Sequence, residues 1–124
     1  MNDNKKLAKI VSASLEIKER GNLNFWINVS YEYGLNQGIG GITLDTYNEE
    51  KKRRIGTAYG CEFIRQLLLC LDVNDFSEMK GKVIWVFGHG EGCSFQPTGI
   101  KPLNVDNPKQ KALMFADIAK EFGI

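Results

Sequence analysis

The sequence predicts an α+β domain: an N-terminal antiparallel β-sheet that opens with a long hairpin, then a central helix and a C-terminal helix. Residues 10–33 alternate between apolar and polar, residues 57–73 carry apolar side chains at helical spacing, and residues 108–122 are amphipathic. At 43% hydrophobic and 25% charged, the 124 residues fit one globular domain, residues 1–124. Its polar N-terminus, residues 1–9, is expected to be flexible.

The predicted hairpin consists of two strands joined by a Gly/Asn turn at residues 19–22. One face of the first strand holds Val11, Ala13, Leu15 and Ile17, and one face of the second holds Leu23, Phe25, Ile27, Val29, Tyr31 and Tyr33. Trp26 is the one large apolar side chain on the otherwise polar face of the second strand. This position indicates that protein, another subunit or a ligand covers the indole.

The remaining elements follow from local patterns along the chain. Before the central helix, we expect a glycine-rich segment at 34–41, a short strand at 42–45 and an exposed charged connection at 48–54. The helix is capped by Thr57, and a helical turn at 75–80 and a strand at 82–87 follow it. A flexible loop at 88–92 then leads to a strand within 93–103 that Pro97 and Pro102 interrupt. Residues 83–87 are apolar on both faces of the predicted strand. That strand is therefore expected to be covered on both faces. Asn107-Pro108 is expected to start the last helix.

Composition excludes several classes of protein. The three cysteines, Cys61, Cys70 and Cys93, form no CxxC pair, which argues against a disulfide framework or a structural zinc site and favours a reducing cytoplasm. No apolar run is long enough to span a membrane. The formal net charge of +1 gives no basis for bulk nucleic-acid binding. We expect no cofactor, no metal and no membrane partner.

Catalytic motifs are also missing from the sequence. The single histidine, His89, would have to serve any nucleophile, and Cys93 lies only four residues away in the same loop, whereas such partners usually come from distant segments. There is no GxSxG, HExxH or P-loop pattern, and the glycine segment precedes a strand instead of a helix. A protein that is not an enzyme is therefore expected.

The best candidate for anion binding is the basic run 51–54, which leads into Thr57 at a predicted helix start. Helix N-termini and guanidinium groups both bind phosphate oxygens. An ordinary charged loop, balanced by Glu49 and Glu50, remains the alternative interpretation of the same residues. Trp26 and Trp85 offer faces on which a base can stack, although packing against protein explains them equally well.

Several segments between residues 10 and 90 resemble a family of small bacteriophage proteins. The family pattern GQGxGGxxLD corresponds to residues 37–45, GTAxGxEFIR to residues 56–65, and a strand after LKGK to the segment that ends at Val86. We identify this pattern with the Thoeris anti-defence sponges, which bind cyclic ADP-ribose signals. The resemblance implies an antiparallel sheet, helices that interlock across a dimer, and possible assembly of dimers into hexamers.

The resemblance also implies a function: a non-enzymatic phage protein, acting in the cytoplasm of the infected bacterium, that sequesters cyclic ADP-ribose isomers or cyclic di- and trinucleotides. The ligand-binding residues predicted on this basis are Gly38, Gly40 and Gly41 for backbone contacts, Arg53, Arg54 and Arg65 for phosphates, Thr57 at the helix start, and Trp85, Phe87 and His89 beside the base. Two alternatives remain open. One is an inhibitor of a host nuclease, of anti-CRISPR type, that binds through Trp26 and the charged segment. The other is an enzyme that degrades the signal through His89 and a carboxylate.

Overall fold

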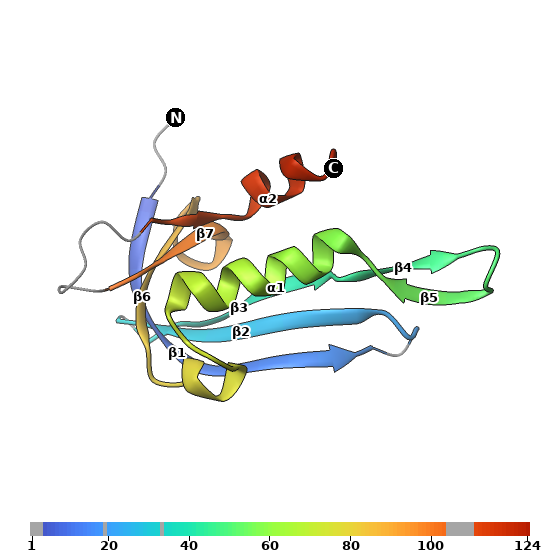
Figure 1. Cartoon of the computed structure of the whole chain (residues 1–124). Helices are drawn as coiled ribbons and strands as arrows, with labels where there is room; N and C mark the ends of the chain where they lie inside the picture. The colour runs from blue at the N-terminus through green and yellow to red at the C-terminus, as the bar shows by residue number, and fades with distance from the viewer. Residues whose placement is uncertain (1–3, 19, 33, 104–110) are drawn as a thin grey trace.

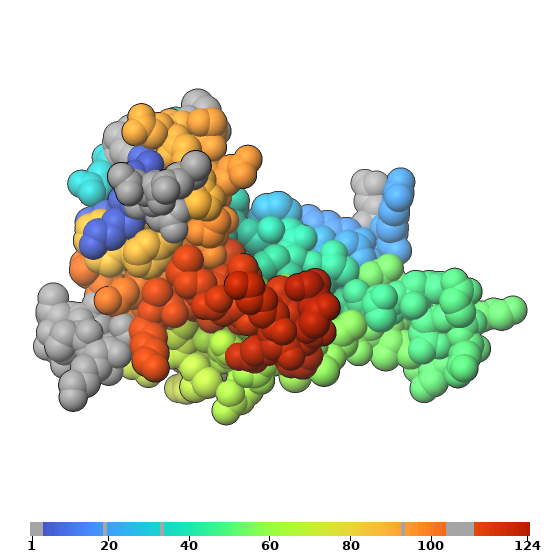
Figure 2. Space-filling view, turned by 90° about the horizontal axis from the view of Figure 1, so that it is seen from above, coloured from blue at the N-terminus to red at the C-terminus, as the bar shows by residue number. Residues whose placement is uncertain are grey.

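Two helices lie over one face of a curved, six-stranded antiparallel sheet, and a two-stranded hairpin projects from this body (Figures 1 and 2). This computed structural model describes residues 4–18, 20–32, 34–103 and 111–124. The strand order in the large sheet is β3-β2-β1-β6-β7-β8. The predicted α+β class, with a long hairpin first, is confirmed.

The large sheet consists of β1 (Asn4–Ile17), β2 (Leu23–Tyr31), β3 (Asn36–Thr43), β6 (Val83–His89), β7 (Gln96–Pro102) and β8 (Leu113–Met114). The projecting hairpin consists of β4 (Asp45–Asn48) and β5 (Arg53–Gly56). The helices are α1 (Ala58–Leu71) and α2 (Phe115–Glu121), with two short 3-10 turns, η1 (Phe76–Met79) and η2 (Gly92–Ser94). The predicted start of the last helix, Asn107-Pro108, lies outside the described residues.

The predicted β1–β2 hairpin is present, and its turn closes as the Gly/Asn chemistry requires. The N–H of Lys18 donates to the carbonyl of Asn22 at 2.9 Å, and the N–H of Gly21 donates to the carbonyl of Lys18 at 2.8 Å. Gly21 has a φ of +82°, a conformation that glycine adopts without steric cost. Glu19 in the predicted turn and Tyr33 at the end of the second strand lie outside the described residues.

The first strand begins at Asn4, so the prediction of a flexible N-terminus is wrong from that residue on. Residues 4–9 pair with β6, from Asn4 opposite Gly88 to Lys9 opposite Val83. Two of their three lysines, Lys5 and Lys6, are compatible with a strand because their long side chains lie over aromatic rings. The ammonium of Lys5 lies 4.6 Å from the ring centre of Trp85, a distance typical of cation–π contact.

The apolar alternation of β1 is interrupted by a bulge between Ile10 and Ser12. Ile10 is buried, but the face predicted from the sequence is largely uncovered, with Val11, Leu15 and Ile17 at 45%, 48% and 67% exposure. Phe25, which lies opposite Leu15 on β2, is buried by Phe63 of α1 at 5.1 Å between ring centres. The helix thus covers β2 and leaves this end of β1 open.

The glycine-rich segment is a strand and forms most of β3. The predicted exposed connection 48–54 is confirmed over residues 49–52, which form the exposed turn of the β4–β5 hairpin, whereas residues 48, 53 and 54 belong to its strands. The strand β3 forms because β2 supplies a complete antiparallel partner, from Asn24 opposite Thr43 to Ser30 opposite Asn36. Tertiary pairing here overrides the low strand propensity of glycine.

The expectation that residues 82–87 are covered on both faces is wrong. Ile84 and Val86 are buried under the helices, whereas Trp85 and Phe87 are half-buried on the opposite face, which no described helix covers. This strand therefore alternates like the others in the sheet. The strand also continues through His89, two residues further than predicted.

The core lies between the sheet and α1, with α2 and η1 closing its ends. Its fully buried large side chains are Ile10, Phe25, Ile27, Val29, Phe63, Leu67, Leu71, Met79, Ile84, Val86, Ile100 and Ile118. They come from strands and helices spread over the whole described chain and form one contiguous cluster.

Candidate functional site

A cleft of about 430 Å³ opens where the free edge of β3 faces the two helices. We call it the glycine cleft. It is lined by Gly38, Ile39, Gly40, Ile42, Tyr59, Pro97, Phe115 and Ala116. Its volume is within the range of small-molecule sites, which usually combine apolar walls with a few directed polar groups. Two of the predicted ligand-binding residues, Gly38 and Gly40, line this cleft.

The polar groups of the cleft come from the backbone of β3. The N–H of Tyr31 donates to the carbonyl of Leu35 at 2.8 Å, which fixes the phase of the β2–β3 ladder. Because bonded pairs alternate along antiparallel strands, Gln37 and Ile39 direct their peptide groups toward β2. The N–H and C=O of Gly38 consequently point to the open edge, where an exposed glycine leaves them accessible to a ligand.

Aromatic side chains form the opposite wall. Tyr59, in the first turn of α1, packs edge-on against Phe63 at 6.0 Å and against Phe122 at 6.1 Å between ring centres. Phe115, at the start of α2, lies 5.6 Å from Phe63. Burial raises the pKa of the Tyr59 hydroxyl, so the phenol remains neutral at physiological pH. Tyr59 and Phe115 thus present aromatic surface beside the exposed backbone of Gly38.

A short hydrogen-bond relay holds the two ends of the curved sheet together next to the cleft. Tyr31 donates its hydroxyl proton to Gln37 Oε1 at 2.5 Å, and Gln37 Nε2 donates to the carbonyl of Phe95 at 2.8 Å. Phe95 immediately precedes β7, which contributes Pro97 to the cleft. The relay therefore fixes the distance between β3 and β7 before any ligand binds.

The glycines of β3 also accommodate Trp26 on the other face of the sheet. A Cβ on Gly38 or Gly41 would lie 3.2 Å or 3.0 Å from the indole ring, closer than ordinary packing allows. The ring of Trp26 therefore extends across β3, and Lys18 places its ammonium 5.7 Å from the ring centre. Of the three covers expected for this indole, the structure shows protein, namely the neighbouring strand of the same chain. Its indole Nε1 is buried and has no hydrogen-bond partner among the described residues.

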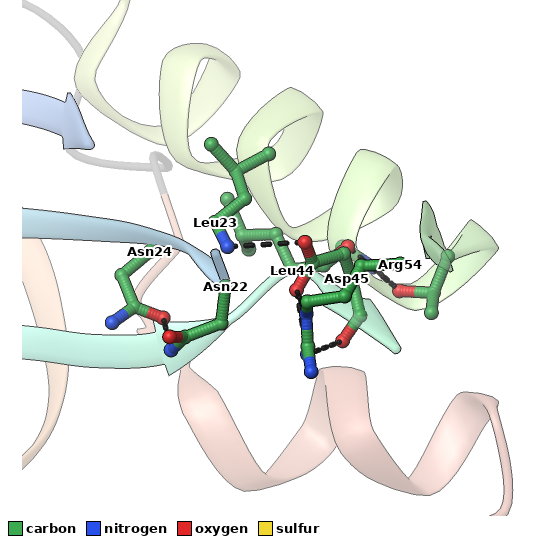
Figure 3. A network of polar contacts seen from close by, with 8 residues as sticks. Asn22, Leu23, Asn24, Leu44, Asp45 and Arg54 are labelled. Atoms are coloured by element: carbon green, nitrogen blue, oxygen red, sulfur yellow. Dashed lines mark hydrogen bonds and ion pairs between the residues drawn. The ribbon is translucent and has the colours of Figure 1, made fainter. Parts of the chain in front are cut away.

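Arg54, which was predicted to bind phosphate, makes internal contacts at the base of the projecting hairpin (Figure 3). Thr57, predicted as a ligand contact at the helix start, is also bonded within the chain. Arg54 donates from Nε and Nη2 to Asp45 Oδ1 at 3.0 Å and 2.8 Å, and Asp45 Oδ2 accepts from the N–H of Leu23 at 3.1 Å. Thr57 Oγ1 accepts from the N–H of Gly60 at 2.9 Å and donates to the carbonyl of Leu44 at 3.0 Å. These bonds join the hairpin to β2 and cap the helix.

The ion pair gives Asp45 a pH-dependent role in stability. The hydrogen bonds from Arg54 lower the pKa of Asp45, with a smaller contribution from the N–H of Leu23. A carboxyl whose pKa is lowered by folding contributes stability above its unfolded pKa of about 3.9, and that contribution is lost as the pH falls through the folded value. Asp45→Asn should therefore lower the melting temperature by a few degrees at pH 7 and by progressively less below about pH 4.

Thermal unfolding of the wild type and Asp45→Asn between pH 7 and pH 2.5 checks this prediction. Asp117→Asn, at an exposed position in α2, serves as the control and should follow the wild type. Other carboxyls with a lowered pKa, Glu16 and Asp75, are present in every variant and cancel in the comparison. A constant gap between wild type and Asp45→Asn across this pH range would contradict the assignment.

The remaining predicted residues do not converge on the glycine cleft. Arg53 is exposed in β5, and Arg65 is exposed on α1, where its Nη1 lies 3.7 Å from Glu62. Trp85 and Phe87 lie on the sheet face that points away from α1, and the exposed His89 ends β6. The prediction thus combined residues from separate surfaces of one protomer.

The prediction of ligand-binding residues missed Ile39 and Ile42 of β3, and it missed four cleft residues from other elements: Tyr59, Pro97, Phe115 and Ala116. Their sequence neighbourhoods give no signal of a site, because they come from α1, β7 and α2 and meet only through the fold. The one local signal is Tyr59, an aromatic residue two positions after the helix cap.

A second depression, of about 310 Å³, lies on the sheet face away from the helices and includes Leu7, Lys9, Val83 and Glu32. Its walls are mostly apolar, and Lys9 and Glu32 carry opposite charges there, so it offers no net positive charge to an anion. The glycine cleft combines the exposed backbone of Gly38 with aromatic side chains, which makes it the better candidate for a nucleotide ligand.

No protein-family model matches the chain, and no curated protein matches it significantly. Within the described ranges, no helix has the length and apolar character needed to cross a membrane, and no group of three His, Cys, Asp or Glu side chains is placed to bind a metal ion.

Proposed function

We propose that this chain is a phage anti-defence protein that binds a cyclic nucleotide signal in the glycine cleft and sequesters it without cleavage. In this proposal it acts as a homo-oligomer in the cytoplasm of the infected bacterium. The observation that carries the proposal is the pairing of an exposed glycine backbone at Gly38 with the aromatic wall of Tyr59 and Phe115.

Each part of such a ligand has a counterpart in the cleft. Backbone N–H groups bind phosphate oxygens where a strand or turn presents them without side-chain obstruction. Aromatic side chains offer a face on which a purine base stacks, a contact worth about 1–3 kcal/mol per base. The residues that line the cleft, so far as the structure describes them, carry no charged side chain, so neutral backbone donors supply the phosphate contacts.

Sequestration needs affinity instead of catalytic groups. A sponge lowers the concentration of a free signal only if it holds the ligand tightly, and nanomolar binding corresponds to about 12 kcal/mol. His89, the residue on which a degrading enzyme would depend, is at the end of β6 and is not one of the described residues that line the cleft. The placement favours binding over hydrolysis.

A nuclease inhibitor that binds through Trp26 has less support. The indole ring extends over Gly38 and Gly41 of the same chain, so its position is explained without a partner protein. The charged side chains of the β4–β5 hairpin give no indication of a partner protein.

Isothermal titration calorimetry with a panel of ligands tests the proposal. The panel contains cyclic ADP-ribose isomers, cyclic dinucleotides and cyclic trinucleotides, and linear ADP-ribose is the control. We expect one cyclic class to bind with nanomolar affinity and to be recovered unchanged, by chromatography, after the protein is denatured by heat. Folded protein that binds no member contradicts the proposal. Recovery of a cleaved product identifies an enzyme instead.

A further inference from the structure

Half of β1 forms an open edge of the large sheet. The pairing of β1 with β6 ends at Lys9, and one more bridge follows, in which Ile10 exchanges backbone hydrogen bonds with residues 81 and 82 at 2.7 Å and 2.8 Å. Beyond Ile10, no described residue pairs with this side of β1. Figure 1 shows this half of the strand as the outermost element of the sheet. We call residues 11–17 the β1 edge.

The phase of the β1–β2 ladder determines which peptide groups face outward. Lys18 donates its N–H to Asn22, so the bonded pairs continue at Glu16 with Asn24 and at Ser14 with Trp26. The N–H and C=O groups of the intervening residues, Ala13, Leu15 and Ile17, consequently point away from β2. The β1 edge thus presents regularly spaced donors and acceptors in the arrangement that another strand requires.

The same residues carry apolar side chains that the fold leaves uncovered. Leu15 is 48% exposed and Ile17 is 67% exposed, and both lie on the face of the sheet that holds the core. Natural sheets usually protect an edge with proline, inward-pointing charge or a covering segment. Within residues 11–17 there is no proline, and the one charged residue, Glu16, bonds to Lys18 and to Ser14 on the other face.

We propose that the β1 edge is a homodimer interface, at which two copies of this chain pair their β1 strands antiparallel about a twofold axis. This inference rests on the self-association in the proposed function and is independent of the nucleotide ligand. An isologous pairing needs a self-complementary surface. A register centred on Leu15 gives such a surface, because Ala13 then lies opposite Ile17 of the partner subunit. The outward-pointing N–H and C=O groups of the two β1 strands can then bond to one another.

Charge favours this register over one of its two neighbours. Centred on Leu15, the pairing places Glu16 opposite Ser14 of the partner subunit and Lys18 opposite Ser12 of the partner subunit, so no like charges lie opposite one another. The next register, centred on Glu16, sets two glutamates directly opposite, an arrangement that destabilises cross-strand pairs. The apolar side chains stay on one face and continue the stripe across the twofold axis.

Amide hydrogen exchange resolved by residue tests the pairing directly. In the monomer, the N–H groups of Ser14 and Glu16 should exchange slowly because they bond to β2, while those of Ala13, Leu15 and Ile17 exchange fast. Raising the protein concentration should protect only the second set, by at least tenfold. Fast exchange of Ala13, Leu15 and Ile17 at every concentration overturns the proposal.

Light scattering with a matched pair of variants provides the second measurement. The wild type should approach twice the chain mass of 14.0 kDa as concentration rises. Leu15→Lys, which places two ammonium groups at the twofold axis, should remain at 14.0 kDa, whereas Leu69→Lys, at a 60% exposed position on α1, should still dimerise. A wild type that is monomeric up to about 1 mM, or a Leu15→Lys variant that dimerises like the control, overturns the interface.

Nucleotide titration of the monomeric Leu15→Lys variant separates this inference from the proposed function. The glycine cleft is formed within one chain by β3, β7 and the helices, so the variant should keep its ligand affinity. Dimerisation without any nucleotide binding leaves the interface standing and removes the proposed function. Nucleotide binding by a wild type that never dimerises removes the interface and leaves the proposed nucleotide binding standing.

Discussion

Replacing Gly60 by alanine should destabilise the protein strongly, although alanine is the better helix former. A Cβ at residue 60 would lie 2.2 Å from the carbonyl oxygen of Leu44, which is backbone and cannot rotate away. The displacement costs about 1–3 kcal/mol or more, against roughly 1 kcal/mol gained from helix propensity. Moving Leu44 also strains the bonds that its carbonyl accepts from Thr57. The net loss is then about 1–2 kcal/mol, and we expect a melting temperature lower by roughly 5–10 °C.

Thermal unfolding of Gly60→Ala and Gly56→Ala checks this prediction. Gly56 is four residues earlier and is exposed, and a Cβ on it would meet no atom within 4 Å. The control should therefore unfold within a few degrees of the wild type. If both variants unfold at the same temperature, the close approach of α1 to the end of β3 does not constrain the fold.

Sequence patterns predicted those parts of the fold in which neighbouring residues decide the structure. The alternation in residues 10–33 identified the first hairpin, and Thr57 was identified as the helix cap, where its Oγ1 accepts from Gly60. In both places the partner lies nearby in sequence. Local chemistry was sufficient because it leaves few competing arrangements.

Prediction failed where a distant partner decides the structure. Residues 4–9 are polar, and they form a strand because β6, about eighty positions later, completes their ladder. The glycine segment is a strand because β2 supplies its antiparallel partner, and its glycines leave the space that the ring of Trp26 occupies. A single sequence does not display either contact, since both depend on strand order in the finished sheet.

The candidate site shows the same division. Gly38 and Gly40 were predicted as backbone contacts, and they line the glycine cleft. The assignment of Arg54 to a phosphate overlooked Asp45, nine residues earlier, which the register of β4 and β5 brings within hydrogen-bonding distance. Charged residues in a hairpin often pair across it, so a basic run identifies an anion site only once its own register is known.

A bulky side chain in the glycine cleft should abolish nucleotide binding and leave the fold intact. Ala116 lies in the cleft wall and is exposed in α2, so Ala116→Trp can project its indole toward Tyr59 without entering the core. An indole there occupies the space of a purine base. We expect the affinity for the cyclic ADP-ribose isomer that binds the wild type to fall at least a hundredfold, which corresponds to about 2.7 kcal/mol.

Ala112→Trp is the matched control, because Ala112 is also exposed and lies in a separate depression beside Cys70 and Leu113. Calorimetry should give wild-type affinity for this control, and both variants should melt within a few degrees of the wild type. Equal affinities for the two variants would exclude the glycine cleft as the binding site. Loss of binding only in Ala112→Trp would move the site to the surface between α1 and β8, because that is where the second indole would lie.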